Sequence, residues 1–353
     1  MKAVCRHFGA CGGCALQDLA PDIYLQRKRA LIVAALARYG IFDPPLREIT
    51  PVPPRSRRRA TLKIEKKNSE THIGFHAARS HALIDILECH VLTPALFTAA
   101  RGIARMLSPF LRDGDDINVY LVEAQNGIDL ALQRKRRAIP ELTAAIAAAA
   151  PALNIVRVTS GNDLLFQTAA PEVCVGKAAM KIPLQAFLQP TREGEQVVLR
   201  CVTDAVGKAK RIADLFSGCG TFSLPLAERA RIHAVDADAP MLAALAGAAR
   251  VTSGLKPITI ERRDLFALPL SAAELKTFDA VLLDPPRAGA LAQAKQLAKS
   301  GIRRIAYVSC DAASFARDAR VLLDGGYRLD WIVGVDQFLW SAHIELAAAF
   351  SRN

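Results

Sequence analysis

The chain has 353 residues, enough for two domains that each bury their own core. Hydrophobic residues make up 51% of it, as expected for a globular protein. The first residues contain no apolar segment, so we expect no signal peptide, and the most apolar stretch, near residues 144–156, is too weak to span a membrane. These properties argue against a secreted or membrane-spanning protein and predict a cytosolic one. Its eight cysteines are then more plausible as ligands, nucleophiles or core residues than as disulfides.

The net charge of +12 is concentrated in the first half of the chain. Residues 1–192 hold 26 Lys and Arg against 16 Asp and Glu, whereas residues 193–353 hold 20 against 18. The excess lies in three basic runs, at residues 27–29, 55–67 and 134–137. Clustered positive charge attracts a polyanion through counterion release, so the first half is predicted to bind nucleic acid. Any one run could instead be a solvated face.

Three thiols open the chain, Cys5, Cys11 and Cys14, and the last two flank a pair of glycines in a tight C-x-x-C loop. Such a loop can hold a metal ion or an iron–sulfur cluster, but three thiolates leave a four-ligand site one short. Cys89 is the best candidate for the fourth ligand. Zinc is the chemical competitor, because the spacing alone does not exclude it. Unliganded core cysteines are the structural alternative, which the flanking glycines make hard to defend.

The first half reads as a small α+β domain, which we place at residues 1–186. Helical periodicity predicts a helix over residues 22–38, ended by a glycine at position 40, and a proline-rich connector follows at residues 44–54. Alternating runs at residues 60–66 and 71–75 predict a hairpin. Further strands are expected at residues 117–122, 127–133 and 155–159, with antiparallel pairing.

From residue 196 onward, predicted helices and strands alternate. A helix at residues 197–206 leads to strands at 211–216 and 231–235, to one that ends at Asp264, and to two apolar strands at 278–283 and 305–309. The last predicted strand covers residues 331–335. This alternation predicts an α/β fold over residues 187–353, with a doubly wound, mostly parallel sheet and right-handed crossovers.

Reactive side chains follow two neighbouring strands of this sheet. One strand end offers Asp284, on a segment that two prolines keep out of a helix, and the next offers Cys310. Buried parallel strands deliver side chains to a site at their carboxyl ends, so this pair predicts an active site. A free cysteine is often only a core residue, but Cys310 stands at a strand end between polar neighbours. Glu345, on an otherwise apolar stretch, is either a solvated charge or a base held in a pocket, and we favour the base.

The first strand of the second half ends in a glycine-rich turn that suits a nucleoside cofactor. Gly218 and Gly220 let the backbone approach a ligand, and Asp236 ends the next strand, where an acid can accept both ribose hydroxyls. The third glycine of the dinucleotide pattern is missing. With Asp264 placed to reach an adenine amino group, S-adenosylmethionine fits better than a dinucleotide. A nucleotide-binding domain without catalysis is the alternative.

One reaction needs this set of groups. The C5 atom of uracil is a poor nucleophile, but a thiolate that adds to C6 makes an enolate whose C5 can attack a methyl sulfonium. A carboxylate must then remove the C5 proton so that the thiolate can leave. Asp284 can meanwhile hold the pyrimidine edge. A base within folded RNA has to be extracted to reach such a pocket.

Across nearly its whole length the chain resembles the S-adenosylmethionine-dependent RNA uracil-5-methyltransferases. The matching motifs are Cys5…Cys11-Gly12-Gly13-Cys14-x-x-Gln17 with Cys89, Phe187-x-Gln189, Asp214-Leu215-Phe216-x-Gly218-x-Gly220-x-Phe222, Asp284-Pro285-Pro286-Arg287, Tyr307-Val308-Ser309-Cys310 and His343-x-Glu345. The resemblance implies a Rossmann-like methyltransferase domain with Cys310 as nucleophile and Glu345 as proton acceptor. It also implies a shared cofactor and base site, lined by Gln189, Phe216, Gly218, Asp236, Asp264 and Asp284.

The resemblance further implies that Cys5, Cys11, Cys14 and Cys89 bind a [4Fe–4S] cluster, as in the branch that acts on 23S ribosomal RNA. Methyl transfer needs no electrons, so we expect the cluster to be structural or to position RNA. We expect no β-barrel RNA-binding domain before the cysteines, as in the shorter ribosomal RNA enzymes, and we expect the helix near residues 22–38 to pack on the catalytic domain.

The chain departs from the family pattern at Pro190-Thr191, at Asp311 and at Leu339-Trp340-Ser341, which puts contacts with the target base in doubt. A tRNA or a cytosine as the substrate stays open. An amino-group methyltransferase fits less well, because Arg287 stands where an aromatic residue would stack. An RNA-binding iron–sulfur protein with an inactive catalytic domain is the non-enzymatic alternative.

Overall fold

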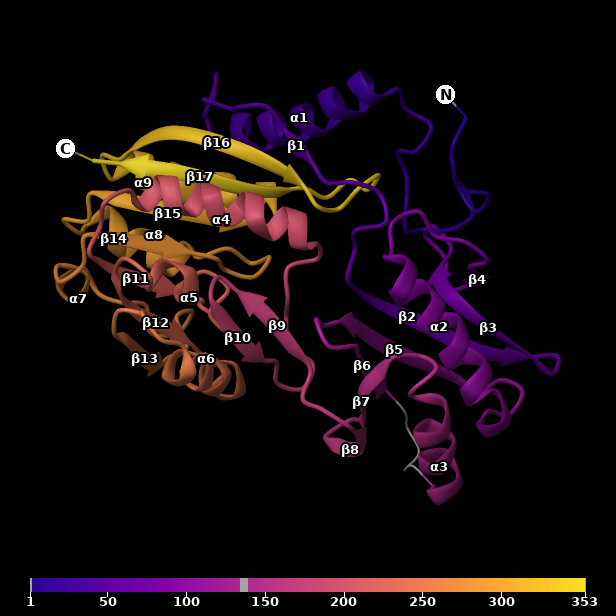
Figure 1. Ribbon diagram of the computed structural model, residues 1–353. Coiled ribbons are helices and arrows are strands. Elements are labelled where there is room, and N and C mark those ends of the chain that lie inside the picture. Colours follow the sequence, from indigo (N-terminus) through magenta and orange to yellow (C-terminus); the bar gives the residue numbers. More distant parts are fainter. Residues whose placement is uncertain (1, 134–138, 353) are drawn as a thin grey trace.

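The structure is a computed structural model that describes residues 2–133 and 139–352 (Figure 1). The predicted basic run at residues 134–137 lies outside the described residues. Two large sheets lie apart from each other, one built by the first half of the chain and one by the second (Figure 1). In the described part of the chain, no helix has the length and hydropathy that a membrane span requires.

The first sheet has seven strands in the order β4-β3-β2-β5-β6-β7-β8. These are β2 (Arg59–Lys67), β3 (Glu70–His76), β4 (Leu83–Asp85), β5 (Asp116–Glu123), β6 (Ile128–Gln133), β7 (Ile155–Ser160) and β8 (Asp163–Gln167). All pairs are antiparallel except β6 with β7, which α3 (Pro140–Ala149) connects. Helix α2 (Pro94–Leu107), extended by the short η1 (Ser108–Phe110), shares the apolar core with α3. The predicted hairpin and α+β organisation are confirmed.

The second sheet has eight strands in the order β1-β16-β17-β15-β14-β11-β12-β13. They are β1 (Thr50–Pro51), β11 (Arg211–Leu215), β12 (Arg231–Asp236), β13 (Ile258–Arg262), β14 (Ala280–Leu283), β15 (Arg304–Ser309), β16 (Arg328–Asp336) and β17 (Glu345–Ser351). Strands β11 to β15 are parallel to one another. The predicted doubly wound sheet is confirmed.

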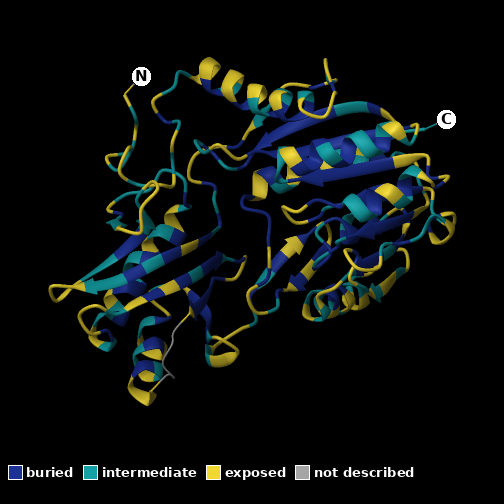
Figure 2. Cartoon of the chain, turned by 180° about the vertical axis from the view of Figure 1, so that it is seen from behind, coloured by how far each residue is buried: buried dark blue, intermediate teal, exposed yellow. Residues whose placement is uncertain are grey.

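Helices cover both faces of this sheet, and the central strands between them are buried (Figure 2). One core holds residues of α1 (Pro21–Ala37), α7 (Ala272–Leu275), α8 (Leu291–Ala298) and α9 (Ala312–Asp324). The other holds α4 (Arg192–Val206), α5 (Ser223–Leu226), α6 (Ala239–Val251) and the hairpin of β9 (Glu172–Val175) and β10 (Ala178–Lys181). Because both faces are covered, the central strands are continuous apolar runs.

The strand that ends the chain was missed by the prediction that the last strand lies at residues 331–335. Strand β17 runs antiparallel between β15 and β16, with Leu346 opposite Ser309 and Glu345 opposite Val335. Residues 345–350 are all buried, so β17 shows no alternation of apolar and polar residues. The register places Glu345 beside the carboxyl ends of both neighbouring strands.

Packing crosses the predicted division between residues 186 and 187 from both sides. Helix α1 contributes Ile32 and Leu36 to the core of the second sheet. The proline-rich segment, predicted as a connector, contains β1, which pairs with β16 through Thr50 and Val335. From the other side, the β9–β10 hairpin packs against α6 and the second sheet. The domain boundary itself stays a prediction.

A fully buried ion pair ties α1 to Asp336, the last residue of β16, and further hydrogen bonds reach the segment between β16 and β17. The Nζ atom of Lys28 lies 2.7 Å from Oδ1 of Asp336 and also donates to the carbonyl oxygen of His343. The hydroxyl of Tyr24 donates to the other oxygen of Asp336 and accepts from the backbone N–H of Trp340 at 2.9 Å. Lys28, in the basic run at residues 27–29, is therefore neither on a solvated face nor available to a polyanion.

We expect Asp336→Asn to lower the free energy of unfolding by about 3–5 kcal/mol, because it leaves the charge of Lys28 buried without a counter-ion. Denaturant unfolding followed by circular dichroism measures this change. As a control, Asp324→Asn breaks the exposed pair that Asp324 makes with Arg320 at 2.7 Å, and should change stability by less than about 0.5 kcal/mol. Equal effects of the two substitutions would contradict the assignment.

Candidate active site

The carboxyl ends of the central parallel strands open into one pocket of about 950 Å³, within the size range of small-molecule sites. Phe338 and residues 341–343, between β16 and β17, form part of its wall, and Gly12, Gly13, Arg57 and Arg59 reach it from the N-terminal part of the chain. All eight residues predicted for catalysis and cofactor binding line this pocket: Gln189, Phe216, Gly218, Asp236, Asp264, Asp284, Cys310 and Glu345.

One end of the pocket is a cradle formed by the turn after β11. Gly218 has a φ of +54°, a conformation that strains other residues, and a Cβ atom there would meet nothing within 4 Å. The carboxylate of Asp236 accepts from the N–H groups of Gly218 at 2.8 Å and Asp238 at 2.9 Å. A carboxylate has about four acceptor positions, so two remain for a ligand's hydroxyl groups.

Aromatic rings and a second carboxylate form the next part of the wall. The ring centroids of Phe216 and Phe266 lie 5.4 Å apart, and both residues face the pocket. Phe216 has a φ of +63°, which is unfavourable for a phenylalanine and is typical of functional sites. Oδ1 of Asp264 accepts from the N–H of Phe266 at 2.9 Å, which orients the carboxylate at the pocket wall.

Glu345 and Gln189 are joined by a residue that the sequence analysis missed. The Nε2 atom of Gln337 lies 2.9 Å from Oε2 of Glu345 and 2.8 Å from Oε1 of Gln189. Burial raises the pKa of Glu345 to about 7, although the hydrogen bond from Gln337 acts in the opposite direction. Gln337 directly follows β16 and is not titratable, so the sequence carried no signal for it.

Cys310 and Asp284 stand at the ends of the adjacent strands β15 and β14. Burial, with smaller contributions from Glu345 and Asp284, raises the pKa of the Cys310 thiol to about 11, whereas Arg287 acts in the opposite direction. Burial, together with Glu345 and other carboxylates nearby, holds the pKa of Asp284 well above its usual range. Without a ligand, the Cys310 thiol is therefore mostly protonated near pH 7, and burial favours the protonated form of Asp284. A neutral Asp284 can donate a hydrogen bond as well as accept one.

Part of the basic run at residues 55–67 faces the interior, so a solvated face does not describe all of it. Arg58 is buried and lies 2.5 Å from the carboxylate of Glu195. The guanidinium of Arg59 lies 4.3 Å from the ring centroid of Phe187, and in the described part of the chain its buried Nε finds no hydrogen-bond partner. Both Arg59 and Phe187 line the pocket.

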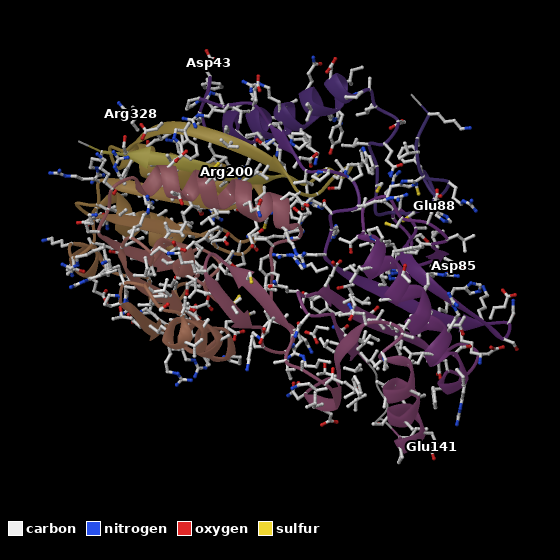
Figure 3. All side chains as sticks on the ribbon, in the orientation of Figure 1. Asp43, Asp85, Glu88, Glu141, Arg200 and Arg328 are labelled. Carbon is white, nitrogen blue, oxygen red and sulfur yellow. The ribbon has the colours of Figure 1, made fainter. Side chains whose placement is uncertain are left out.

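The four cysteines predicted as ligands line a second, smaller pocket next to the first, together with Glu88, which is labelled in Figure 3. Burial raises the pKa of Cys14 to about 11, and the negative charges of Cys89, Cys11 and Cys5 act in the same direction. Backbone N–H groups donate to two of the sulfurs, from Gly13 to Cys11 at 3.4 Å and from Leu92 to Cys89 at 3.5 Å. The fold therefore brings the four thiols together.

Within residues 2–133 and 139–352, no three Cys, His, Asp or Glu side chains converge as the ligands of one metal ion would. A preformed zinc site, the alternative from the sequence, is therefore not found among them. An iron–sulfur cluster differs from a single ion because each of its four thiolates binds a different iron, so the ligands surround a larger group.

The whole chain is similar to known RNA methyltransferases. The family described as tRNA (Uracil-5-)-methyltransferase matches residues 132–353. The 23S rRNA (uracil(1939)-C(5))-methyltransferase RlmD of Aeromonas hydrophila is 31% identical over 372 residues, which cover 99% of this chain and 82% of the relative. An uncharacterised RNA methyltransferase of Rhizobium meliloti is 38% identical over 354 residues, with 99% and 85% covered.

A solved structure shares the fold. The tRNA (uracil-54, C5)-methyltransferase of Pyrococcus abyssi, in complex with S-adenosyl-L-homocysteine, gives a TM-score of 0.73 at 23% identity. The likeness covers 96% of this chain and 84% of that one. Both the catalytic sheet and the N-terminal sheet are therefore part of an architecture seen before.

The raised pKa of Glu345 predicts how stability depends on pH. Its pKa is about 7 in the folded chain, against about 4.3 when unfolded, so between these values only the folded chain holds the proton. The free energy of unfolding therefore falls as the pH rises through this window. Glu345→Gln cannot titrate and therefore lacks this pH-dependent loss of stability. As the pH rises from 5 to 8, the free energy of unfolding of the wild type should fall by about 2–3 kcal/mol relative to that of the variant.

Urea unfolding at the two pH values measures this effect. Glu274→Gln is the matched control, because hydrogen bonds from Arg263 and Ser271 lower the pKa of Glu274 to about 2. Glu274 is thus ionised in both states throughout the window, and its replacement should show no such trend. If the free energy of unfolding of Glu345→Gln changes with pH as that of the wild type does, the carboxyl of Glu345 is not held protonated by burial.

Proposed function

This chain belongs to the tRNA (uracil-5-)-methyltransferase family, and we propose that it methylates C5 of a uridine in 23S ribosomal RNA through a covalent adduct on Cys310. The observation that carries the proposal is the single pocket that holds a thiol, a buried carboxyl with a pKa of about 7 and a glycine cradle beside Asp236. Each of these groups has a separate task in the reaction.

The cradle end of the pocket fits S-adenosylmethionine. Asp236 would accept the ribose hydroxyls, and Gly218 lets the backbone approach the ligand. Asp264 is placed to accept from the adenine amino group, and the rings of Phe216 and Phe266 supply apolar walls. When bound, S-adenosylmethionine supplies a methyl group on a positively charged sulfonium.

The catalytic end of the pocket activates the uridine. The thiolate of Cys310 forms a bond to C6, and Asp284 donates a hydrogen bond to a carbonyl oxygen on which negative charge develops. The C5 atom then takes the methyl group. Glu345 removes the proton from C5, and the returning electron pair breaks the bond between C6 and Cys310. A base with a pKa of about 7 can accept this proton and release it to water near neutral pH.

The choice of 23S ribosomal RNA rests on the similarity to the Aeromonas hydrophila enzyme and on the four cysteines. An RNA-modifying enzyme of this kind would act in the cytoplasm. The test is methyl transfer from labelled S-adenosylmethionine to unmodified 23S RNA and tRNA, followed by nucleoside analysis. The proposal expects 5-methyluridine in 23S RNA. Product in tRNA alone would refute the substrate, and no 5-methyluridine in either RNA would refute the enzyme.

We also propose that Cys5, Cys11, Cys14 and Cys89 bind a [4Fe–4S] cluster. The shared pocket, the four thiols and the backbone donors to sulfur support it. Anaerobically prepared protein should contain about four iron atoms and four labile sulfides per chain. Cys14→Ser should lose both, whereas Cys174→Ser, an exposed thiol on β9, should keep them. Iron retained without sulfide would contradict the cluster and point to a single metal ion.

The proposed roles of Cys310 and Glu345 predict that their variants stop the reaction at different steps. Cys310→Ala should abolish methyl transfer and form no adduct, because no bond to C6 can form. Glu345→Gln should slow product formation by about 10²–10⁴-fold and accumulate a methylated protein–RNA complex that survives denaturation, since elimination stalls. Denaturing gels with labelled RNA measure both. Cys201→Ala, a thiol of α4 outside the pocket, should behave as the wild type. An adduct that persists in Cys310→Ala would contradict the assignment.

A further inference from the structure

Gln337 occupies a buried position between the carboxyl of Glu345, the proposed proton acceptor, and the amide of Gln189, which lines the same pocket. It directly follows β16, is 1% exposed, and is preceded by Asp336, which the ion pair with Lys28 holds in place. Both of its hydrogen bonds leave from the same atom, Nε2, toward Gln189 and Glu345. Its other amide atom, Oε1, is buried and has no hydrogen-bond partner among the residues that the structure describes.

The hydrogen-bond chemistry leaves one arrangement of this trio when Glu345 is ionised. A carboxylate only accepts, so the amide atom of Gln337 that faces it must be the NH₂ group. The second proton of that NH₂ group points to Gln189, whose facing atom must then be an acceptor, Oε1. The amine of Gln189 and the Oε1 atom of Glu345 are left to serve the pocket that both residues line.

Two further observations favour a functional reason for Gln337. A buried amide oxygen without a partner lowers stability, and an apolar side chain of similar size would avoid that cost. In addition, helix α4 has a glycine where it meets this side chain: a Cβ atom on Gly194 would come within 2.6 Å of Oε1 of Gln337. The first turn of α4 thus packs closely on the amide and fixes its orientation.

From this geometry we propose that Gln337 is a positioning residue, which sets the atoms that Gln189 and Glu345 present to the target base. Its donor keeps the carboxylate of Glu345 oriented with one oxygen free to take the C5 proton. The same donor turns the amine of Gln189 toward a carbonyl oxygen of the uracil. This inference rests on the proposed function and adds a residue to it.

The groups around Glu345 decide what a pH measurement can report. Arg59 faces it from β2 and lowers its pKa, while Asp284 and Cys310 face it from the ends of β14 and β15. Each of these groups stays in place when Gln337 alone is replaced. A shift of the acid limb of the pH–rate profile, where the rate falls because Glu345 is protonated, can then be assigned to the lost hydrogen bond.

The test is Gln337→Met, which keeps the volume and removes the donor. Methyl transfer and the covalent RNA adduct are measured between pH 5.5 and pH 9 (roughly the window that brackets the Glu345 pKa). We expect the acid limb to move to higher pH by about one pH unit, with more adduct than in the wild type below that limb. Gln293→Met is the matched control, since Gln293 is fully buried and bonds only the backbone of Leu270, away from the pocket.

A double-mutant cycle tests whether Gln189 and Gln337 act together. Gln189→Met, Gln337→Met and the double variant should be non-additive, because either single change breaks the same bridge. If Gln337→Met does not fold, Gln337→Glu keeps the side-chain length and replaces the donor by a second carboxyl, which should move the acid limb further upward.

An unchanged acid limb in a folded variant, or additive effects with Gln189→Met, would overturn the inference. Binding of S-adenosylhomocysteine and thermal unfolding show whether each variant is folded. A wild-type protein that makes no 5-methyluridine would instead refute the proposed function.

Discussion

The insertion of β17 between β15 and β16 is the constraint on which the catalytic arrangement depends. An antiparallel strand begins at the edge of the sheet where its parallel neighbours end. The first residue of β17, Glu345, therefore lies beside the carboxyl end of β15, where Cys310 follows Ser309. The sheet register, rather than a flexible loop, brings the two groups into one pocket. Such placement on rigid elements is what a reaction with two covalent steps requires.

Burial has a cost that shapes the chemistry of this pocket. Desolvation is the largest cause of the raised pKa of Glu345, Asp284 and Cys310, and it outweighs the hydrogen bond from Gln337 and the charge of Arg287. With a pKa of about 11, only about one Cys310 in ten thousand is ionised at pH 7. A bound ligand that brings positive charge to the pocket would lower this pKa and favour the thiolate.

The N-terminal part of the chain contributes to the same pocket. The carbonyl oxygen of Trp340 accepts from the N–H groups of Ala15 at 2.8 Å and Leu16 at 3.1 Å, directly after the cysteine loop. Tyr24 and Lys28 hold the same segment from the other side. A segment that faces the target-base region is thus fixed by the two N-terminal elements. This explains why a methyltransferase domain packs so closely on α1 and on the cysteine loop.

The sequence was enough to predict the site residues that stand at the ends of parallel strands. It was not enough to predict the strand and the contacts that depend on pairing between distant segments. Asp284 and Cys310 could be predicted because apolar runs of strand length end at polar residues, and parallel strands share one edge. Strand β17 could not, because a buried alanine-rich run has no period that separates strand from helix. The burial of Lys28 and the bridge through Gln337 depend on partners 308 and 148 residues away in the chain, which no local pattern encodes.

We propose that Cys310 forms a bond to C6 of the target uridine and that Glu345 removes the proton from C5 after methyl transfer. RNA that carries 5-fluorouridine tests it most directly, because fluorine at C5 cannot be removed as a proton and the adduct is trapped after methyl transfer. Peptide mapping by mass spectrometry then locates the cross-link. The account predicts a methylated 5-fluorouridine on the peptide that contains Cys310. A cross-link on another cysteine, or methylated RNA without any covalent intermediate, would contradict it.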